Sequence, residues 1–553
     1  MAHTTSSAGT DAESDFLLQT YTRLRQAIAE RTAPRTTGPE PSITPSSSAL
    51  ATCLSSLPHP SSPTYLQPLG PSRTHAHLLS TILPALNLQS LSPRYLAFVT
   101  GGVLPIAEAA DNLVTALDQN VQVHFPFSSE NPPCTAHSAG TAVEDAALRM
   151  LISLLDLDGD GDGGTWQGRT FTTGATASNV LGLACAREAI IDRRLASLPP
   201  SSSTTSSSSS SSPPTVSTLG LLAACQLANI SAIQILTSMG HSSLSKAASV
   251  VGLGRASVRE LGRAEEPWRL DLDRVEEELA RAEAEGRTAS IIVVSAGEVN
   301  TGRFATSVLD MPKLRSLADR YGAWIHVDGA FGIFARALPK TDEFLSLHAC
   351  VAGLELADSI AADGHKILNV PYDNGIFLCR DASVLTAVCS NTNAAYLASP
   401  ASGDANAILS PLNIGIENSR RFRALSVYAV LLSEGRSGIA AMLSRMVLLA
   451  RAIAAYVRDS PHYELLPGGG SGDDDASSLS LESTYMVVLF RARDEALNDV
   501  LVDRINGSGR VFVSGTRWGE KKAVRMAVSN WRVEVEKDAE VVREVLTAVA
   551  EGR

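Results

Sequence analysis

The chain has 553 residues, which is more than one ordinary domain holds and predicts two or three packed units. Its formal net charge of −12 and the lack of a basic run argue against a nucleic-acid partner. No apolar run approaches the roughly 18 residues of a membrane span, and the first residues lack the features of a secretory signal. The seven cysteines include no CxxC pair, which is typical of reduced thiols. We therefore expect a soluble cytoplasmic protein with no membrane and no nucleic-acid partner.

The first 74 residues are not expected to form a domain. Residues 1–14 are small and polar and are predicted to be disordered, whereas residues 16–28 have the apolar spacing of a helix. Many prolines and serines interrupt the stretch from 34 to 71. We interpret residues 1–74 as a disordered start followed by an N-terminal arm.

Residues 75–399 alternate between helix and strand patterns. Helices are expected up to residue 117 and at 141–155, 175–194, 271–285 and 312–321. Strands are expected near 170 and at 233–236, 291–294, 323–328 and 375–379. Such alternation predicts an α/β fold, in which helices cover both faces of a mostly parallel sheet.

Two polar segments interrupt this large domain. Residues 201–212 are almost pure serine between prolines, and such a tract cannot bury apolar area. We therefore expect a disordered insertion at 197–216. The acidic stretch at 156–161 resembles the start of a calcium loop, but Gln167 stands where a bidentate Glu is needed. It is interpreted as a solvated turn, and no metal site is expected.

The character of the sequence changes after residue 400. Two long helices are expected, one ending near 432 and one at 439–457. Strands at 485–490, 510–514 and 523–529, a helix at 494–505 and a last helix follow. Residues 400–553 are therefore predicted to form a separate small α+β domain.

Lys366 lies in a short polar turn between two apolar stretches that read as buried strands. Burial disfavours the ammonium form of a lysine, so its amine could be neutral and form a Schiff base with a carbonyl compound or with pyridoxal phosphate. The alternative is a structural lysine that is ion-paired at the end of a strand.

Three other features are predicted to share a sheet edge with Lys366. They are the Gly174 turn before a helix, His241 after a strand, and Asp328 at the end of a strand. In parallel sheets, ligands bind at the carboxyl ends of the strands. A lysine, a carboxylate, a flat side chain and a helix N-terminus for phosphate are the parts that pyridoxal phosphate requires.

Several motifs resemble the group II pyridoxal-phosphate-dependent decarboxylases, the family of the aromatic-amino-acid, glutamate, histidine and diaminobutyrate decarboxylases. The motifs are Asp358-Ser-x4-Gly-His-Lys366, Asn369-Val-Pro-Tyr-Asp-x-Gly375, Thr173-Gly-Ala-Thr-x-Ser-Asn179, His241-Ser-Ser, His326-Val-Asp-Gly-Ala330 and Ser419-Arg-Arg-x-Arg-Ala-Leu425. The likeness covers roughly residues 75 to 530. It implies the aspartate-aminotransferase type of fold (fold type I) and a homodimer with shared active sites.

The resemblance also implies roles for individual residues. Lys366 is similar to the Schiff-base lysine, and Asp328 to the partner of the pyridine nitrogen. Tyr396 falls where the family has a mobile-loop tyrosine that handles the Cα proton. The other expected contacts are made to the ring and to the phosphate of the cofactor. Ala330 and His241 are expected at the two faces of the ring, and His241 is also expected to be catalytic. The residues expected at the phosphate are Ala175, Thr176, Ala177 and His365.

The reaction implied is the decarboxylation of an L-amino acid to its amine and carbon dioxide. An aldehyde-forming oxidative deaminase, an aminotransferase and a non-catalytic binding protein on the same fold are the alternatives. Two departures from the family stand out. The turn at 297–300 contains Glu298 where the family often has threonines, and the segment at 98–102 lacks an aromatic pair, so the substrate is left open.

Overall fold

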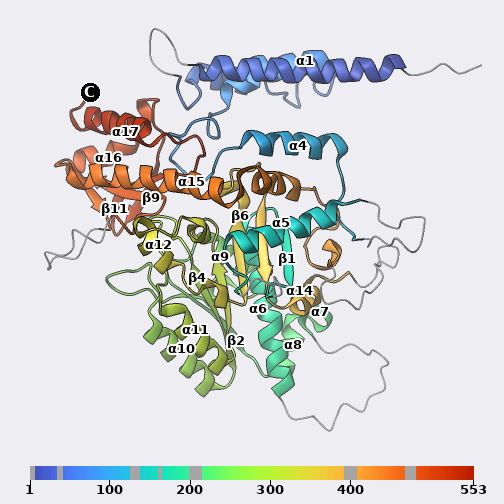
Figure 1. Cartoon of the computed structure of the whole chain (residues 1–553), viewed down its shortest axis with the longest axis vertical. Coiled ribbons are helices and arrows are strands. Elements are labelled where there is room, and N and C mark those ends of the chain that lie inside the picture. Colours follow the sequence, from blue (N-terminus) through green and yellow to red (C-terminus); the bar gives the residue numbers. More distant parts are fainter. Residues whose placement is uncertain are drawn as a thin grey trace, which may run out of the picture.

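Two β-sheets organise the protein, whose computed structural model is shown in Figure 1. The structure describes residues 7–33, 41–124, 138–159, 165–197, 215–391, 408–467 and 481–553. One sheet has seven strands in the order β1-β7-β6-β5-β4-β2-β3, and the other has four strands in the order β10-β11-β9-β8. Helices cover both faces of the larger sheet, whereas the smaller sheet carries helices α16 (Glu495–Gly507) and α17 (Val535–Ala550).

The larger sheet is mostly parallel, as the sequence predicts. Its strands are β1 (Gly168–Thr172), β2 (Ala232–Thr237), β3 (Val258–Glu260), β4 (Thr288–Ser295), β5 (Trp324–Asp328), β6 (Ser359–Asp363) and β7 (Gly375–Cys379). Strands β3, β2, β4, β5 and β6 pair in parallel, while β7 is antiparallel to both β6 and β1. The carboxyl ends of all strands except β7 therefore meet at one edge.

The two faces of this sheet bury separate apolar cores. In β4, Ile291 and Val293 belong to one core, and Ile292 and Val294 belong to the other. This alternation follows from the two-residue period of a strand, and it explains why β4 reads as a continuous apolar run. The fold class is thus an α/β fold of type I with a second, smaller α+β part.

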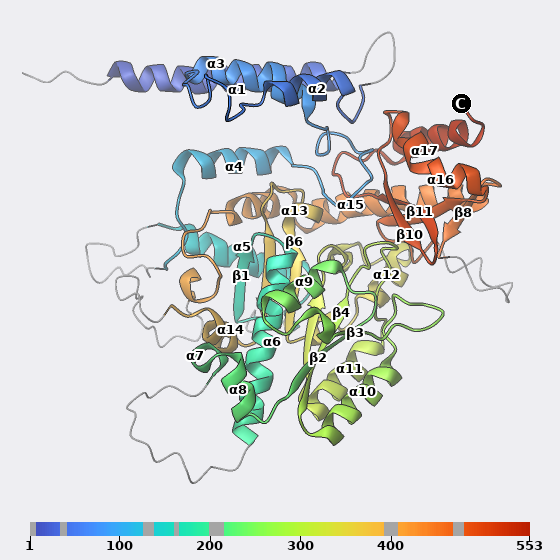
Figure 2. The ribbon, with the colours of Figure 1, turned by 180° about the vertical axis from the view of Figure 1, so that it is seen from behind.

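The helices of the large domain follow the expected order. They are α4 (Pro105–Leu117), α5 (Gly140–Leu154), α6 (Ala175–Ser197), α7 (Val216–Leu219), α8 (Leu221–Leu227), α9 (Ser242–Val250), α10 (Leu272–Glu285), α11 (Asp310–Tyr321), α12 (Leu345–Cys350), α13 (Gly364–Ile367) and α14 (Ala382–Cys389). Helices α6 and α9 lie on one face with the core that contains Ile291, while α5, α10 and α11 lie on the other. Figure 2 shows the face with α6.

Helix α6 approaches the sheet unusually closely at Gly182. A Cβ atom placed on Gly182 would lie 2.6 Å from Nδ1 of His326, whose ring points from β5 into the helix. Such a distance is shorter than any real Cβ contact, so only glycine fits here. This close approach brings Asn179, one turn earlier in α6, within reach of the end of β5.

The C-terminal part differs from the prediction at two strands. Its strands are β8 (Tyr463–Leu466), β9 (Val487–Ala492), β10 (Ser514–Trp518) and β11 (Lys521–Ala527). The sequence missed β8, and the strand expected at 510–514 was wrong, because Phe512 forms an isolated bridge with Tyr95 from the N-terminal part instead of pairing in the sheet. The two expected long helices are one element, α15 (Ala424–Asp459), which is broken by the non-helical Gly435.

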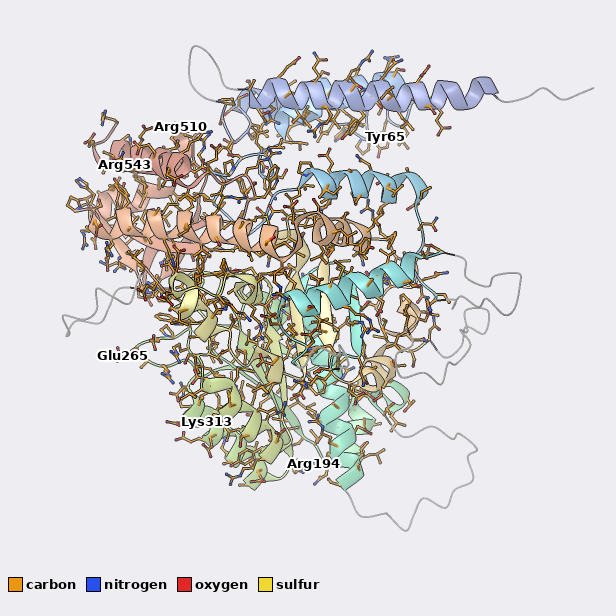
Figure 3. The ribbon with its side chains drawn as sticks, in the orientation of Figure 1. Tyr65, Arg194, Glu265, Lys313, Arg510 and Arg543 are labelled. Carbon is orange, nitrogen blue, oxygen red and sulfur yellow. The ribbon has the colours of Figure 1, made fainter. Side chains whose placement is uncertain are left out.

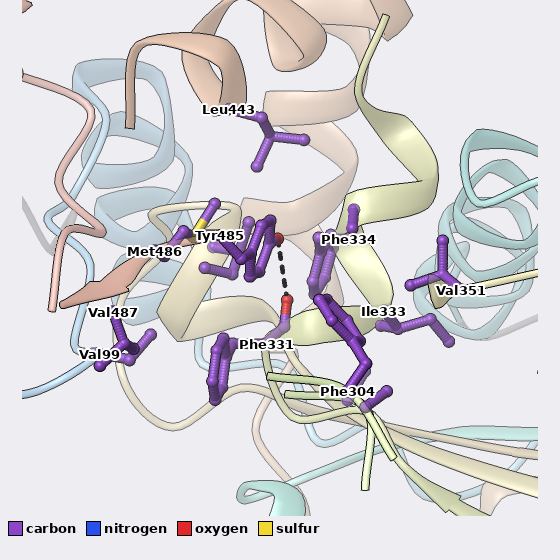
Figure 4. Close-up of a cluster of buried hydrophobic side chains, with 14 of the residues drawn as sticks. Val99, Phe304, Phe331, Ile333, Phe334, Val351, Leu443, Tyr485, Met486 and Val487 are labelled. Carbon is purple, nitrogen blue, oxygen red and sulfur yellow. Dashed lines mark hydrogen bonds between the residues drawn. The ribbon is translucent and has the colours of Figure 1, made fainter. Parts of the chain in front are cut away.

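Apolar side chains join the two sheets, as Figure 4 shows. Tyr485 and Met486, next to β9, pack with Phe304, Phe331 and Val99 in a single buried core. The Tyr485 hydroxyl donates a hydrogen bond of 3.2 Å to the Phe331 carbonyl, so this buried phenol keeps a partner. The small domain is therefore fixed against the segment that follows β5.

The N-terminal arm forms more helix than expected. Helix α1 (Ser7–Thr32) lies over α4 in both ribbon views, and α2 (Ser47–Ser56) and α3 (Pro71–His77) follow it. The prediction of disorder through residue 14 was wrong from Ser7 onward, because no proline or glycine breaks the helix between residues 10 and 32. Arg25 forms an ion pair with Glu108 on α4, at 3.1 Å.

Of the described residues, one helix is long and apolar enough to cross a membrane. It is α15, and half of the relevant window is buried inside the protein. Its apolar side chains, such as Leu443 and Met446, pack in the core shared with the small domain.

Charged residues labelled in Figure 3, such as Lys313 on α11 and Arg543 on α17, lie on the surface.

Several predictions about the chain's organisation stay predictions. The expected boundary at residue 74 falls inside α3, and the boundary at 400 lies outside the described residues. The serine tract and most of the proposed insertion at 197–216 also lie outside them.

Candidate active site

The expected site residues gather at the carboxyl edge of the larger sheet. The Gly174 turn follows β1, His241 follows β2, Asp328 ends β5, and Lys366 lies on α13 just after β6. Hydrogen bonds and ion pairs link these elements, as described below. Tyr396 lies outside the described residues, so its place in the site stays a prediction.

Lys366 is ion-paired, which differs from the neutral amine expected from burial. Its Nζ lies 2.9 Å from Oδ2 of Asp363, and about a quarter of its side chain (24%) is exposed. The lysine thus reaches solvent and faces a carboxylate. In this structure, Lys366 is therefore the ion-paired lysine at a strand end that the sequence left as the alternative.

Asp363 links Lys366 to the N-terminus of α6. Its Oδ1 accepts a hydrogen bond of 2.6 Å from the backbone N–H of Ala175, the first residue of the helix. The N–H groups of Thr176 and Ala177 donate to no backbone acceptor among the described residues. First-turn N–H groups have no partner inside a helix, so these two remain available for an anion.

His365 lies beside the same helix terminus. Its Nδ1 is 2.8 Å from the carbonyl of Asn374, and its Nε2 is 3.7 Å from Oδ1 of Asp363. Burial lowers the pKa of His365, while the charge of Asp363 opposes this shift. The ring of Tyr372 packs against His365 with centroids 4.5 Å apart.

Asp328 is the end of a line of buried hydrogen bonds that runs through α6. Oδ2 of Asp328 accepts from Nδ2 of Asn179 at 2.9 Å, and Oδ1 of Asn179 lies 2.9 Å from Nε2 of His326. Nδ1 of His326 lies 2.8 Å from the hydroxyl of Ser359, which accepts from the indole N–H of Trp324 at 2.9 Å.

Only one assignment of protons satisfies this whole line. Because the Asn179 amide nitrogen donates to Asp328, its Oδ1 faces Nε2 of His326 and accepts from the Nε2–H. Nδ1 of the neutral ring then accepts from the Ser359 hydroxyl, whose oxygen accepts from the Trp324 indole. Burial lowers the pKa of His326 to about 4, so the ring is neutral near pH 7, as the assignment requires. Every bond then points its donor towards Asp328.

His241 lies at the rim with an exposed side chain. Its Nδ1 accepts from the N–H of Ser243 at 3.2 Å, which fixes the ring at the start of α9. Desolvation by neighbouring atoms lowers the pKa of His241, and the carboxylate of Asp328 opposes that shift. A fixed ring that is open to solvent is suited to stack on a flat ligand.

The segment at 98–102 also borders the site. The N–H groups of Thr100 and Gly101 both donate to the Ser529 hydroxyl at 3.1 Å. Gly101 has φ +61, and a Cβ there would lie 2.8 Å from the carbonyl of His365, so glycine allows this close contact with the lysine turn. The side chain of Phe98, the first residue of this segment, is 52% exposed to solvent.

Glu298 is bonded within its own turn. Its carboxylate accepts hydrogen bonds from Asn300 and Thr301, including both backbone N–H groups at 2.8 Å. It therefore stabilises its own turn after β4. Arg525 on β11 donates to the carbonyls of Val299 and Ala97, which ties this turn to the small domain.

Two residues of the site were missed from the sequence. Asp363 was only an unspecified position of the Asp358-Ser-x4-Gly-His-Lys366 motif, although it lies three residues before Lys366 and ends β6 as Asp328 ends β5. Asn179 was quoted in a motif without a role, and its partner Asp328 lies 149 residues away. Ala330 lies close to Asp328, whose Oδ1 is 3.4 Å from the backbone nitrogen of Ala330, and its contact with the cofactor stays a prediction. Of the described residues, no group of three or more His, Cys, Asp or Glu could hold a metal ion.

A fold of type I whose edge presents a lysine, a carboxylate and a helix N-terminus defines a class of pyridoxal-phosphate enzymes. Residues 226–470 match the family described as the pyridoxal-dependent decarboxylase conserved domain. This match covers less than half of the chain, and over these residues the chain is similar to the pyridoxal-dependent decarboxylases.

Curated relatives resemble most of the chain. It is 25% identical to an L-2,4-diaminobutyrate decarboxylase of Acinetobacter baumannii, over 82% of this chain and 79% of that protein. It is 23% identical to an aromatic-L-amino-acid decarboxylase of Bacillus atrophaeus, over 82% of this chain and 80% of that protein.

Solved structures share the fold. The tryptophan decarboxylase of Oryza sativa with pyridoxal phosphate and tryptamine gives a TM-score of 0.72 at 21% identity, and covers 99% of both chains. The glutamate decarboxylase domain of a Vibrio parahaemolyticus enzyme gives a TM-score of 0.71 at 20% identity, over 99% of this chain and 97% of that chain.

The neutral, buried His326 predicts a specific dependence of stability on pH. Its pKa of about 4 in the folded protein is below the usual 6.5, so the unfolded chain binds the proton more tightly. Stability from this group is complete above pH 6.5 and is lost as the pH falls towards 4. Between about pH 7 and about pH 5, we expect the wild type to lose about 2 kcal/mol more than His326→Gln. Urea unfolding at the two pH values measures the difference, and parallel losses in both proteins would contradict it.

Proposed function

We propose that the protein is a pyridoxal-phosphate-dependent carboxy-lyase that converts an L-amino acid to the corresponding amine and carbon dioxide. The observation that carries the proposal is the shared sheet edge, where Lys366, Asp328 and the N-terminus of α6 converge. The family match supports the same activity. An aminotransferase or a non-catalytic protein has less support, because the relatives reported above are decarboxylases. The aldehyde-forming alternative keeps some support, since a phenylacetaldehyde synthase of Arabidopsis thaliana is 25% identical over 52% of this chain.

The described residues fit the proposed cofactor. The N–H groups of Thr176 and Ala177 have no backbone acceptor and can take the phosphate, next to His365. The side chain of His241 is exposed and can stack on the ring, with Ala330 below it. Lys366 reaches solvent and can supply the linking amine. When bound, pyridoxal phosphate supplies an electron sink for the pair of electrons that the departing carboxylate leaves behind.

The chain's own residues would keep that sink effective. Asn179 orients Asp328 through its amide N–H, and His326 behind it orients Asn179. A carboxylate at this place would hold a proton on the ring nitrogen of the cofactor. Tyr396 is proposed to give the proton to Cα after carbon dioxide has left.

The protein is further proposed to act in the cytoplasm as a homodimer with shared active sites. The described cysteines form no disulfide, which supports a reducing compartment. Large apolar side chains are exposed on the N-terminal helices and on α4: Leu17, Leu18, Leu50, Leu54, Leu113 and Leu117. A monomer rarely leaves so many such residues uncovered, and a second copy of the chain would cover them.

The oligomeric state can be tested on α4. Sedimentation velocity of the wild type should give twice the mass of one chain, and Leu113→Glu should shift the protein towards the monomer. This change places a charge where a half-exposed leucine now lies (50%). Val250→Glu is a matched control, because Val250 is also exposed (64%) but lies on α9, away from the proposed interface. A monomeric wild type would contradict the proposal.

The activity can be tested with a panel of L-amino acids and the purified protein supplied with pyridoxal phosphate. The panel should include 2,4-diaminobutyrate, aspartate, glutamate and the aromatic amino acids. We expect one class of substrate to yield amine and carbon dioxide in equal amounts, without uptake of oxygen or use of a keto acid. Aldehyde with oxygen uptake would indicate an oxidative deaminase, and dependence on a keto acid would indicate an aminotransferase.

Tyr396→Phe tests the proposed proton donor. The variant should still bind the cofactor and release carbon dioxide, but its product should shift from amine towards aldehyde, because oxygen can react where no proton arrives. Amine, aldehyde and oxygen are measured together. Tyr456→Phe is the control, since it removes a phenol that bonds to Thr547 at 2.8 Å in the C-terminal part. Amine formation by Tyr396→Phe at the wild-type rate would remove Tyr396 from the mechanism.

A further inference from the structure

The site contains an anion of its own at the N-terminus of α6. The Asp363 carboxylate is buried (3% of its side chain exposed), and each of its oxygens has a strong donor. Oδ1 accepts from the N–H of Ala175 at 2.6 Å, and Oδ2 lies 2.9 Å from Nζ of Lys366. Nε2 of His365 is 3.7 Å from Oδ1. Asp363 therefore occupies the positive end of the helix dipole.

A phosphate group bound at the N-terminus of α6 would need the same donors that now surround the Asp363 carboxylate. The positive end of α6 and its free N–H groups attract any anion, and Lys366 adds a full positive charge. Two anions at one helix terminus repel each other, and this disfavours the charged form of one or both. Gly174 lies beside both groups, because a Cβ atom on it would be in ordinary contact, at 3.5 Å, with Oδ1 of Asp363 and Cε1 of His365.

We propose that Asp363 is a built-in occupant of the phosphate cradle, which holds Ala175 and Lys366 in place without cofactor and opposes the binding of phosphate. The proposal rests on the cofactor proposed above, because the phosphate of pyridoxal phosphate is the ligand concerned. Loading of the cofactor then requires the carboxylate to release Lys366. Asp363 is in this sense a positioning residue for the lysine.

Asp363→Asn separates the two effects of the carboxylate. The amide keeps an oxygen that can accept from Ala175, but it carries no charge. The apoprotein of this variant should melt at a lower temperature than the wild type, because Lys366 loses its counterion. It should also bind inorganic phosphate about tenfold or more tightly, because one anionic competitor is gone. Isothermal calorimetry with phosphate and thermal melting with and without phosphate measure both effects.

Asp373→Asn is the matched control. It removes one negative charge seven residues after Lys366, but Asp373 pairs with Arg423 at 3.3 Å and makes no described bond to the cradle. Its affinity for phosphate should stay within about twofold of the wild type. An unchanged or weaker affinity in Asp363→Asn, or an equal gain in both variants, would overturn the proposal.

Pyridoxal phosphate distinguishes a failure of this inference from a failure of the proposed function. If the protein attaches pyridoxal phosphate at Lys366 but Asp363→Asn leaves phosphate binding unchanged, only the role of Asp363 is refuted. If phosphate binds more tightly to Asp363→Asn but neither protein attaches pyridoxal phosphate, the role of Asp363 as an anion in the cradle stands and the cofactor is refuted.

Discussion

The close approach of helix α6 to the larger sheet is the constraint on which the site depends. Gly182 lets the helix lie against the ring of His326, where any side chain would collide with it. Held at this distance, α6 reaches both carboxylates of the edge: Ala175 donates to Asp363, and Asn179 donates to Asp328. A helix one side chain further away would lose the short bonds to both residues.

One helix thus sets two different electrostatic environments. At its N-terminus the dipole and free N–H groups favour an anion, which suits phosphate. One turn further on, an uncharged line from Trp324 through Ser359 and His326 ends on Asp328. Burial keeps His326 neutral, so the hydrogen-bonded residues behind Asp328 present oriented dipoles to it. They place no positive charge there that would compete with a cationic group of the ligand. The carboxylate of Asp328 is therefore left to interact with a cationic group of the ligand.

The sequence predicts the fold well where local patterns are strong. Residues 291–294 are apolar throughout, and this reflects a strand whose alternate side chains enter two separate cores. The strand at 510–514 was wrong because Phe512 pairs with Tyr95, which is more than 400 residues away, and no local pattern contains that information. The helical structure of residues 7–14 was missed because these residues are small and polar and have no apolar periodicity. They extend a helix whose apolar positions lie further along the chain.

The site was predictable in position but not in charge. His241, Asp328 and Lys366 could be placed at one edge, because the order of strands and turns dictates where strands end. The ion pair of Lys366 with Asp363 was not expected, since burial was inferred from flanking strands and Asp363 was not considered. The line behind Asp328 joins α6, β5 and β6, so it depends on packing that the sequence does not display.

The most direct measurement of the central claim is the covalent capture of the cofactor. The full-length protein is incubated with pyridoxal phosphate, reduced with borohydride, digested, and analysed by peptide mass spectrometry. The account predicts that the pyridoxyl group is found on Lys366, in a protein that is yellow before reduction. Modification of another lysine, or of none, would contradict the assignment of this sheet edge as the active site.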